Sequence, residues 1–219
     1  MMLEGDMDKL PKEKKNEFLK AIVDKSGKLE IIINDILSAS EFDSQKFAAH
    51  PNSPQIPLES VVDAAVQDAD QEAKQRNIEL KWRKPAQPLP KVTGEAKYLE
   101  QAIYNLISNA LKYTPSTKMV KEARAQRETK GVVEVAIGQE KNDIVVSVKD
   151  NGIGIPKKEI PKLFTKFGRA SNATAMYTDG SGLGLFIVRE IIEGHKGKVW
   201  VESEIGKGST FFVRLPIAA

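Results

Sequence analysis

Two pairs of alternating apolar segments in the second half of the chain constrain its fold most strongly. Residues 132–137 and 144–148 alternate in side-chain character across a short polar connection, and residues 199–202 and 210–215 do so across a glycine-rich one. A period of two residues predicts half-buried strands, and a short connection between two such strands predicts a hairpin. The chain therefore carries two predicted hairpins.

Helices with one apolar face are expected before and between these strands. Apolar side chains recur at three- and four-residue steps in residues 58–76, 98–113 and 183–193, and residues 160–164 predict a further short apolar helix. Residues 78–82 alternate as one more strand. Because the strands outnumber a single hairpin, we expect an α+β fold in which a mixed sheet is layered with helices.

The segment after Pro11 also predicts a helix. Its apolar residues recur mostly at helical steps and are Phe18, Leu19, Ile22, Leu29, Ile32, Ile33, Ile36 and Leu37. An isolated helix of this kind is marginal in water, so it requires a partner helix in this chain or another. Residues 48–57 contain three prolines and predict a linker, and the charged residues 116–130 predict a solvated, mobile excursion.

Composition excludes several classes of function. The net charge is only +3, and basic residues are spread among nearly as many acids, so nucleic acid is not an expected partner. The chain has no cysteine, which rules out disulfides and thiolate metal sites and suits a cytoplasmic protein. No apolar run reaches the length that spans a bilayer, and no signal-peptide pattern begins the chain, although an anchor could lie upstream.

The first cluster with chemical meaning is Asp150-Asn151-Gly152-Ile153-Gly154-Ile155-Pro156, directly after a predicted strand. Glycines let the backbone approach a flat ligand where a Cβ would collide. A carboxylate there can accept a hydrogen bond from an exocyclic amine such as that of adenine. A plain turn after the strand would explain the same residues, because Asn-Gly is a favoured turn dipeptide.

A second glycine cluster, Gly180-Ser181-Gly182-Leu183-Gly184-Leu185, leads into an apolar predicted helix. Free N–H groups at a helix N-terminus and the helix dipole favour a bound phosphate. The cluster lacks the Gly-Lys-Ser ending of a Walker loop and is not a dinucleotide fingerprint. A flexible loop leading into a helix is the alternative interpretation.

Asn105 and Asn109 lie four residues apart on one face of the predicted helix 98–113, with Lys112 on the same face and Tyr113 beside it. Amide oxygens are hard ligands suited to Mg²⁺, which completes its coordination with water and phosphate oxygens. Alternatively, the two asparagines cap or bridge locally. Their spacing and the nearby lysine favour the metal.

These segments, in this order, resemble the ATP-binding catalytic domain of sensor histidine kinases. That domain belongs to the GHKL superfamily, together with DNA gyrase, a heat-shock chaperone and a mismatch-repair ATPase. Residues 98–113 resemble its N box, residues 150–154 and 180–185 its two glycine boxes, and residues 163–169 its phenylalanine box. Gly206-Lys207-Gly208-Ser209-Thr210 is similar to a further Gly-x-Gly-x-Thr element, and the resemblance covers residues 58–217.

The resemblance implies a two-layer α/β sandwich of the Bergerat type, with ATP held between the N-box helix and a lid at residues 168–182.

The resemblance also implies roles for individual residues. Asp150 would bond the adenine amine and Tyr113 would stack near the base, while Asn105 and Asn109 would hold Mg²⁺. Lys112 and Arg169 would be catalytic, supplying positive charge to the phosphates. Further nucleotide-binding residues would be Gly152, Gly154, Ile155, Phe167, Ser181, Gly182, Leu183, Gly184, Leu185 and Thr210. Phe164 and Phe167 are expected to anchor the lid as core aromatics.

The position of Asn105 is a glutamate in hydrolysing relatives, where it activates water. An amide cannot act as a general base, so transfer to a protein acceptor is favoured over hydrolysis. The function implied is therefore that of an ATP-dependent protein-histidine kinase, with a response regulator as downstream partner. A nucleotide-binding scaffold without transfer activity is the alternative.

The resemblance further divides the chain into a partial dimerisation hairpin, a linker and the ATP-binding domain, at residues 1–47, 48–57 and 58–219. Residues 29–37 resemble the second helix of the family's hairpin, and a homodimer through the N-terminal helix is expected in the full-length protein. The first hairpin helix, which carries the acceptor histidine, has no counterpart here. His50 and His195 do not fit the acceptor pattern, and surface structural roles are expected for both. The chain would then be a fragment of a longer kinase, or its acceptor would lie in another chain.

Overall fold

A mixed five-stranded sheet forms the centre of the molecule. The computed structural model describes residues 11–16, 18–19, 22, 26, 53–116, 130–176 and 181–218. In spatial order the strands are β2 (Glu79–Arg83), β4 (Val132–Glu140), β5 (Asp143–Asp150), β7 (Gly208–Pro216) and β6 (Lys198–Glu204). The β2–β4 pair is parallel and the other pairs are antiparallel, which confirms the predicted mixed sheet and both predicted hairpins.

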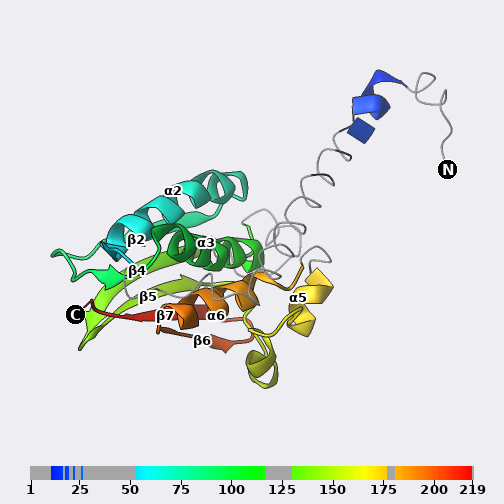
Figure 1. Cartoon of the computed structure of the whole chain (residues 1–219). Coiled ribbons are helices and arrows are strands. Elements are labelled where there is room, and N and C mark those ends of the chain that lie inside the picture. Colours follow the sequence, from blue (N-terminus) through cyan, green and yellow to red (C-terminus); the bar gives the residue numbers. More distant parts are fainter. Residues whose placement is uncertain are drawn as a thin grey trace.

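Three helices cover one face of this sheet (Figure 1). They are α2 (Leu58–Gln75), α3 (Ala96–Tyr113) and α6 (Gly184–Gly194). The strands bury alternate residues, as Val133, Val135 and Ile137 do on β4, so one side of each strand joins the core. The helices contribute fully buried side chains such as Leu106 and Ile187. The predicted two-layer α/β sandwich is therefore confirmed.

The strands extend further than the apolar alternation predicts. In the β4–β5 hairpin the pairing continues from Val135↔Val148 through Gly138↔Val145 to Glu140↔Asp143. Backbone hydrogen bonds sustain this end of the ladder on β4, where Gly138, Gln139 and Glu140 carry no apolar side chain. A two-stranded sheet pairs β1 (Gln55–Ile56) with β3 (Val92–Thr93), so the last part of the predicted linker takes part in the fold.

The predicted apolar helix at residues 160–164 is wrong. The structure instead has a 3₁₀ helix, η2 (Lys157–Lys162), with no buried residue, and the buried Leu163 follows it. Its N–H groups bond three residues back, as Glu159 N–H does to the Pro156 carbonyl, 2.9 Å apart. Pro161 lacks an N–H group and cannot continue an α-helix, which explains the tighter form. Beyond it lies the short helix α5 (Ser171–Met176).

Several predictions fall on residues that the structure describes only in part. Residues 12–16, 18–19, 22 and 26 are helical, and Phe18, Leu19 and Ile22 are exposed. Leu29 to Leu37, His50 and residues 117–129 lie outside the described residues. Within the described ranges, no helix has the length and apolar character needed to cross a membrane.

The surface role expected for His195 is wrong, because the side chain is only 2 % exposed. Its Nδ1 lies 2.7 Å from the Ile191 carbonyl oxygen and must donate, so Nε2 accepts the hydrogen bond from Glu95 N–H at 3.1 Å. A Cβ on Gly94 would lie 2.3 Å from the imidazole ring. The neutral ring thus joins the end of α6 to the start of α3.

We expect His195→Ala to lower the free energy of unfolding by about 2–4 kcal/mol at pH 7.5, through a cavity and an unpaired Glu95 N–H. Burial lowers the pKa of His195, so the folded state binds a proton less readily than the unfolded state. The wild type gains this stability above the ordinary pKa of 6.5 and loses it as the pH falls below that value.

Urea titrations should therefore show a smaller loss of unfolding free energy for His195→Ala at pH 5.5 than at pH 7.5. Glu193→Gln, an exposed change on the same helix, is the control, and a penalty for His195→Ala that does not change with pH would contradict the prediction.

Candidate nucleotide-binding site

Helix α3 presents the predicted metal-binding stripe at one edge of its apolar face. Leu106, Ala110 and Leu111 are buried in the core, while Asn105, Asn109 and Lys112 are half-buried. Neither asparagine side chain makes a hydrogen bond within the described part of the chain, so the alternative of local bridging is not seen there. The ammonium nitrogen of Lys112 lies 5.5 Å from the centre of the Tyr113 ring.

Asp150 ends strand β5 as a buried carboxylate, only 6 % exposed. Its Oδ1 accepts hydrogen bonds from Gly152 N–H at 2.8 Å and Ser209 N–H at 3.2 Å. Burial raises the pKa of Asp150 to about 6, and the two N–H groups offset part of that rise. Among the described residues Oδ2 makes no hydrogen bond, so this carboxylate can offer one oriented acceptor.

The loop after Asp150 lies against the C-terminal end of α3. Ile153 N–H donates to the Tyr113 carbonyl over 3.2 Å, and a Cβ on Gly152 would lie 2.3 Å from that same oxygen. Gly154 has a φ of +67°, and a Cβ there would lie 2.0 Å from the Glu204 carbonyl oxygen. The two glycines are therefore required for close packing of backbone on backbone, whatever ligand the loop binds.

The turn between β6 and β7 supplies the other wall of the Asp150 environment. Ser203 Oγ accepts from Ile155 N–H at 2.8 Å and lies 2.9 Å from Ser209 Oγ. The sequence motifs do not point to a role for Ser203 or Ser209. Only the β5–β7 register, which pairs Lys149 with Thr210, brings these serines beside Asp150. Thr210, a predicted ligand residue, is half-buried on β7.

The second glycine cluster lies next to the phenylalanine box. Gly182 has a φ of +70°, and a Cβ there would lie 2.9 Å from the backbone of Phe167. Ser181 Oγ accepts from Leu183 N–H at 3.2 Å, and Leu183 is buried just before α6 begins. A Cβ on Gly184 would meet no atom of the described residues within 4 Å, so these residues leave the first turn of α6 open in that direction. Leu185 and Arg169 are half-buried, and Gly180 lies outside the described residues.

The two aromatics of the phenylalanine box differ in their environment. Phe164 is half-buried and meets Phe211 edge to face, with ring centres 6.4 Å apart, which agrees with an anchoring role. Phe167 is 69 % exposed and has a φ of +63°, so its expected core position is wrong. The Phe167 backbone lies against Gly182, while the ring is exposed to solvent.

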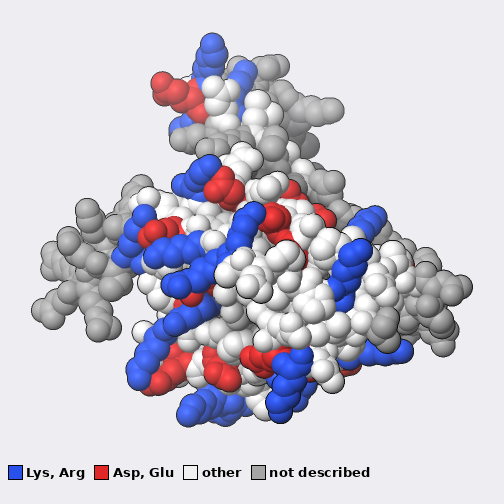
Figure 2. All heavy atoms as spheres, turned by 90° about the vertical axis from the view of Figure 1, so that its left-hand side faces the viewer, with Lys and Arg blue, Asp and Glu red and all other residues white. Residues whose placement is uncertain are grey.

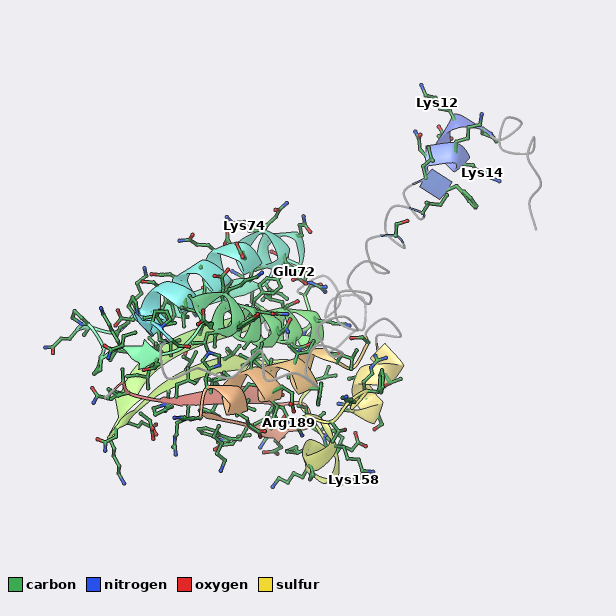
Figure 3. The ribbon with its side chains drawn as sticks, in the orientation of Figure 1. Lys12, Lys14, Glu72, Lys74, Lys158 and Arg189 are labelled. Carbon is green, nitrogen blue, oxygen red and sulfur yellow. The ribbon has the colours of Figure 1, made fainter. Side chains whose placement is uncertain are left out.

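Positive charge collects along η2 and the segment after it. Lys157, Lys158 and Lys162 are exposed, and none forms an ion pair with another described residue. Lys158 projects outward from η2 in Figure 3. Lys166 Nζ lies 5.2 Å from the centre of the Phe186 ring, at the start of α6. The positive electrostatic potential of these lysines favours anionic ligands nearby.

Charges of both signs lie on another part of the surface. On the face that Figure 2 shows, Lys and Arg side chains lie among Asp and Glu side chains. Among the ion pairs of the described residues are Arg83–Glu134 at 2.7 Å and Lys84–Asp63 at 2.7 Å. Glu72 belongs to α2 and is labelled on the side of α2 toward α3 in Figure 3. Its side chain accepts from Ser108 Oγ of α3 at 3.3 Å and from Arg76 Nε at 2.8 Å.

Apart from Asn105 and Asn109, the predicted site residues for which contacts are described fall into two groups. The end of α3, the Asp150 loop and the β6–β7 turn are joined through Tyr113, Ile153, Ser209 and Gly206, whose N–H donates to the Ile153 carbonyl at 2.8 Å. The second glycine cluster is joined to the phenylalanine box through Gly182 and Phe167. Within the described residues, Asn105 and Asn109 make no hydrogen bond to either group. The two asparagines and the two groups can therefore share a function only through a ligand that contacts all of them.

Comparison with known proteins identifies relatives that are named as sensor or sensory kinases. The sensor histidine kinase WalK of Bacillus subtilis is 31 % identical over 199 residues, covering 91 % of this chain and 30 % of that protein. The adaptive-response sensory kinase SasA of Prochlorococcus marinus is 32 % identical over 189 residues, covering 86 % of this chain and 46 % of SasA. The chain thus spans less than half the length of either relative.

Solved structures share the fold. Full-length ShkA in complex with AMPPNP matches with a TM-score of 0.72 and 24 % identity, covering 94 % of this chain and 39 % of that one. The mycobacterial sensor histidine kinase MprB matches with a TM-score of 0.62 and 25 % identity, covering 75 % of this chain and 98 % of that one. The sequence model of the family described as "Histidine kinase-, DNA gyrase B-, and HSP90-like ATPase" matches residues 94–219, more than half of the chain. The chain therefore belongs to this ATPase family.

Proposed function

We propose that this chain is the ATP-binding catalytic domain of a sensor histidine kinase, which transfers the γ-phosphoryl group of ATP to a histidine on a dimerisation helix. The observation that supports it most is the buried Asp150, whose Oδ1 is held by two backbone N–H groups. A carboxylate oriented in this way is suited to accept a hydrogen bond from the adenine amine through Oδ2. Tyr113 lies at the adjoining end of α3, where its ring can contact the base.

The phosphates would lie between α3 and the first turn of α6. Asn105 and Asn109 offer two half-buried amide oxygens one helical turn apart, a donor set that fits Mg²⁺. A bound Mg²⁺ would neutralise phosphate charge there. Lys112 and Arg169 would add positive charge, and the described residues leave space at Gly184 for phosphate oxygens near the α6 N–H groups.

Transfer is favoured over hydrolysis because Asn105 cannot deprotonate water. His195 is not the acceptor, since it is buried and both ring nitrogens are engaged. The acceptor would lie on a helix contributed by the full-length protein or another chain. A homodimer through the N-terminal helix and a response regulator that receives the phosphoryl group complete the proposal, and the relatives named sensor histidine kinases support it.

Mixing the chain with γ-labelled ATP, Mg²⁺ and a dimerisation hairpin that contains the acceptor histidine should yield an acid-labile, alkali-stable label on the hairpin. Asn109→Ala in this chain should reduce the label more than about tenfold, because it removes a charge-assisted contact. A hairpin with the acceptor histidine replaced by alanine is the control. Tight ATP binding without labelling would instead identify a nucleotide-binding scaffold, and steady phosphate release without any hairpin would identify a hydrolase.

A further inference from the structure

Helix α5 is too short to be stable on its own. It spans six residues, Ser171–Met176, whereas isolated helices need roughly 12–15 residues even to be marginal in water. Its position therefore depends on contacts with the rest of the molecule. Ala170 and Ala173 are buried in the main apolar core, which holds one side of the helix.

Glu159 of η2 holds the first residue of α5. Its Oε2 accepts from Ser171 N–H and its Oε1 accepts from Ser171 Oγ, both at 2.8 Å. These two hydrogen bonds, helped by the positive charge of Lys158 and Lys162, lower the pKa of Glu159. The carboxylate is thus ionised at neutral pH and is engaged with α5 through both oxygens.

Asn172 joins α5 to the Asp150 loop. Its Nδ2 donates to the Gly154 carbonyl oxygen at 2.8 Å, and this contact fixes the orientation of the amide, because the opposite orientation would bring two oxygens together. The other amide atom, Oδ1, is buried and has no hydrogen-bond partner within the described part of the chain. Leaving an acceptor buried and unpaired costs at least as much as one neutral hydrogen bond contributes.

The rest of this loop is held from other directions. Ile153 is bonded through Tyr113 and Gly206, and Ile155 N–H donates to Ser203 Oγ. The Gly154 carbonyl lies between these two anchors and is bonded to Asn172. Because the unpaired Oδ1 offsets the gain from that bond, the contact adds little to stability. Local arrangements that break a packing rule without a gain in stability are expected at functional sites.

We propose that Asn172 is a positioning residue of the nucleotide site. It couples α5, which Glu159 holds in place, to the loop that begins at Asp150, and so fixes the loop in the shape that retains the adenine. This inference rests on the proposed ATP-binding function. It assigns roles to Glu159 and Asn172 that the motifs of the family did not indicate.

The test measures nucleotide dissociation and thermal stability together. In stopped-flow experiments with a fluorescent ATP analogue and Mg²⁺, Asn172→Ala should raise the dissociation rate about 3- to 10-fold, the effect of one neutral hydrogen bond. Its Tm should stay within about 2 °C of the wild type, because the unpaired oxygen is removed with the donor. Asn172→Asp, which faces the Gly154 carbonyl with a carboxylate, should raise the rate further. Glu159→Ala should also raise it.

Thr174→Ala is the matched control, since Thr174 Oγ bonds the Ala170 carbonyl one turn earlier in the same segment. It should leave both quantities unchanged. An unchanged dissociation rate in Asn172→Ala, or a rise that a matching fall in Tm explains, would overturn the proposal.

Amide hydrogen exchange of the protein without nucleotide separates this proposal from the proposed function. Asn172→Ala should speed exchange at the amides of Ile153 and Ile155 as well as within α5. Faster exchange confined to α5 would disprove the coupling. If the wild type failed to bind the ATP analogue, the proposed function would be wrong. The hydrogen-exchange result would still decide whether Asn172 positions the loop.

Discussion

Replacing Asp150 with asparagine should weaken ATP binding more than about tenfold and at the same time stabilise the folded domain. The loss of affinity follows because the amide would turn an NH₂ group toward the adenine amine, and a hydrogen bond to a charged group contributes about 1.5–3 kcal/mol. The gain in stability follows because burial raises the pKa of Asp150 from 3.8 to about 6, so the ionised form is costly to keep in the fold. Asparagine retains an oxygen for the N–H groups of Gly152 and Ser209.

The sign of the pH dependence follows from the same shift. The folded state holds the Asp150 proton up to about pH 6, whereas the unfolded state releases it near pH 3.8. The wild type therefore loses stability as the pH rises through this window and stays at the lower level above it. A shift of about two units corresponds to roughly 3 kcal/mol. The advantage of Asp150→Asn should thus be absent near pH 4 and complete by pH 7.

Calorimetry with ATP and Mg²⁺, together with urea titrations at pH 4.5 and 7.5, measures both effects. Asp143→Asn is the matched control, because Asp143 lies at the opposite end of the same strand, where it is 3.8 Å from Arg214. The control should leave ATP affinity unchanged. Equal ATP affinity in Asp150→Asn and the wild type would remove the adenine role of Asp150. If Asp150→Asn were less stable than the wild type at pH 7.5, the buried Asp150 carboxylate would not lower the free energy of unfolding at that pH.

The sequence predicts those parts of the fold whose signal is local. Alternation in β4, β5, β6 and β7 and the three-to-four-residue spacing in α2, α3 and α6 give the sheet and its helical layer. The glycines at 152, 154 and 182 mark real backbone constraints, because each approaches another backbone segment too closely for a side chain. The order of the family motifs along the chain then predicts how these helices and strands follow one another.

Contacts between distant segments could not be predicted in this way. Ser209 bonds Asp150 only because β7 pairs with β5 in one register, and Asn172 reaches Gly154 only because η2 positions α5. The burial of His195 depends on Gly94, about a hundred residues away in the chain. Phe167 has a positive φ and an exposed ring, and its hydrophobicity predicts neither.

Gly208→Ala should destabilise the domain by about 2–5 kcal/mol, which combines the cost of a left-handed alanine with that of a forced backbone shift. Gly208 has a φ of +97°, and a Cβ there would lie 2.0 Å from the Asp150 carbonyl oxygen and 2.9 Å from the Asn151 Cα. The backbone of Asp150 must then move, so ATP affinity should fall as well.

Gly206→Ala, in the same turn, separates the two causes. Gly206 has a φ of +74°, yet a Cβ there would meet no atom of the described residues within 4 Å. This variant should therefore lose only about 1–2 kcal/mol, the cost of the backbone conformation, and should keep its ATP affinity. Urea titration and calorimetry on both variants measure these differences. If the two variants lost equal stability and both bound ATP normally, the contact between Gly208 and Asp150 would have no part in shaping the nucleotide site. A loss of ATP affinity confined to Gly208→Ala would show that the β6–β7 turn fixes the position of the carboxylate on which nucleotide recognition depends.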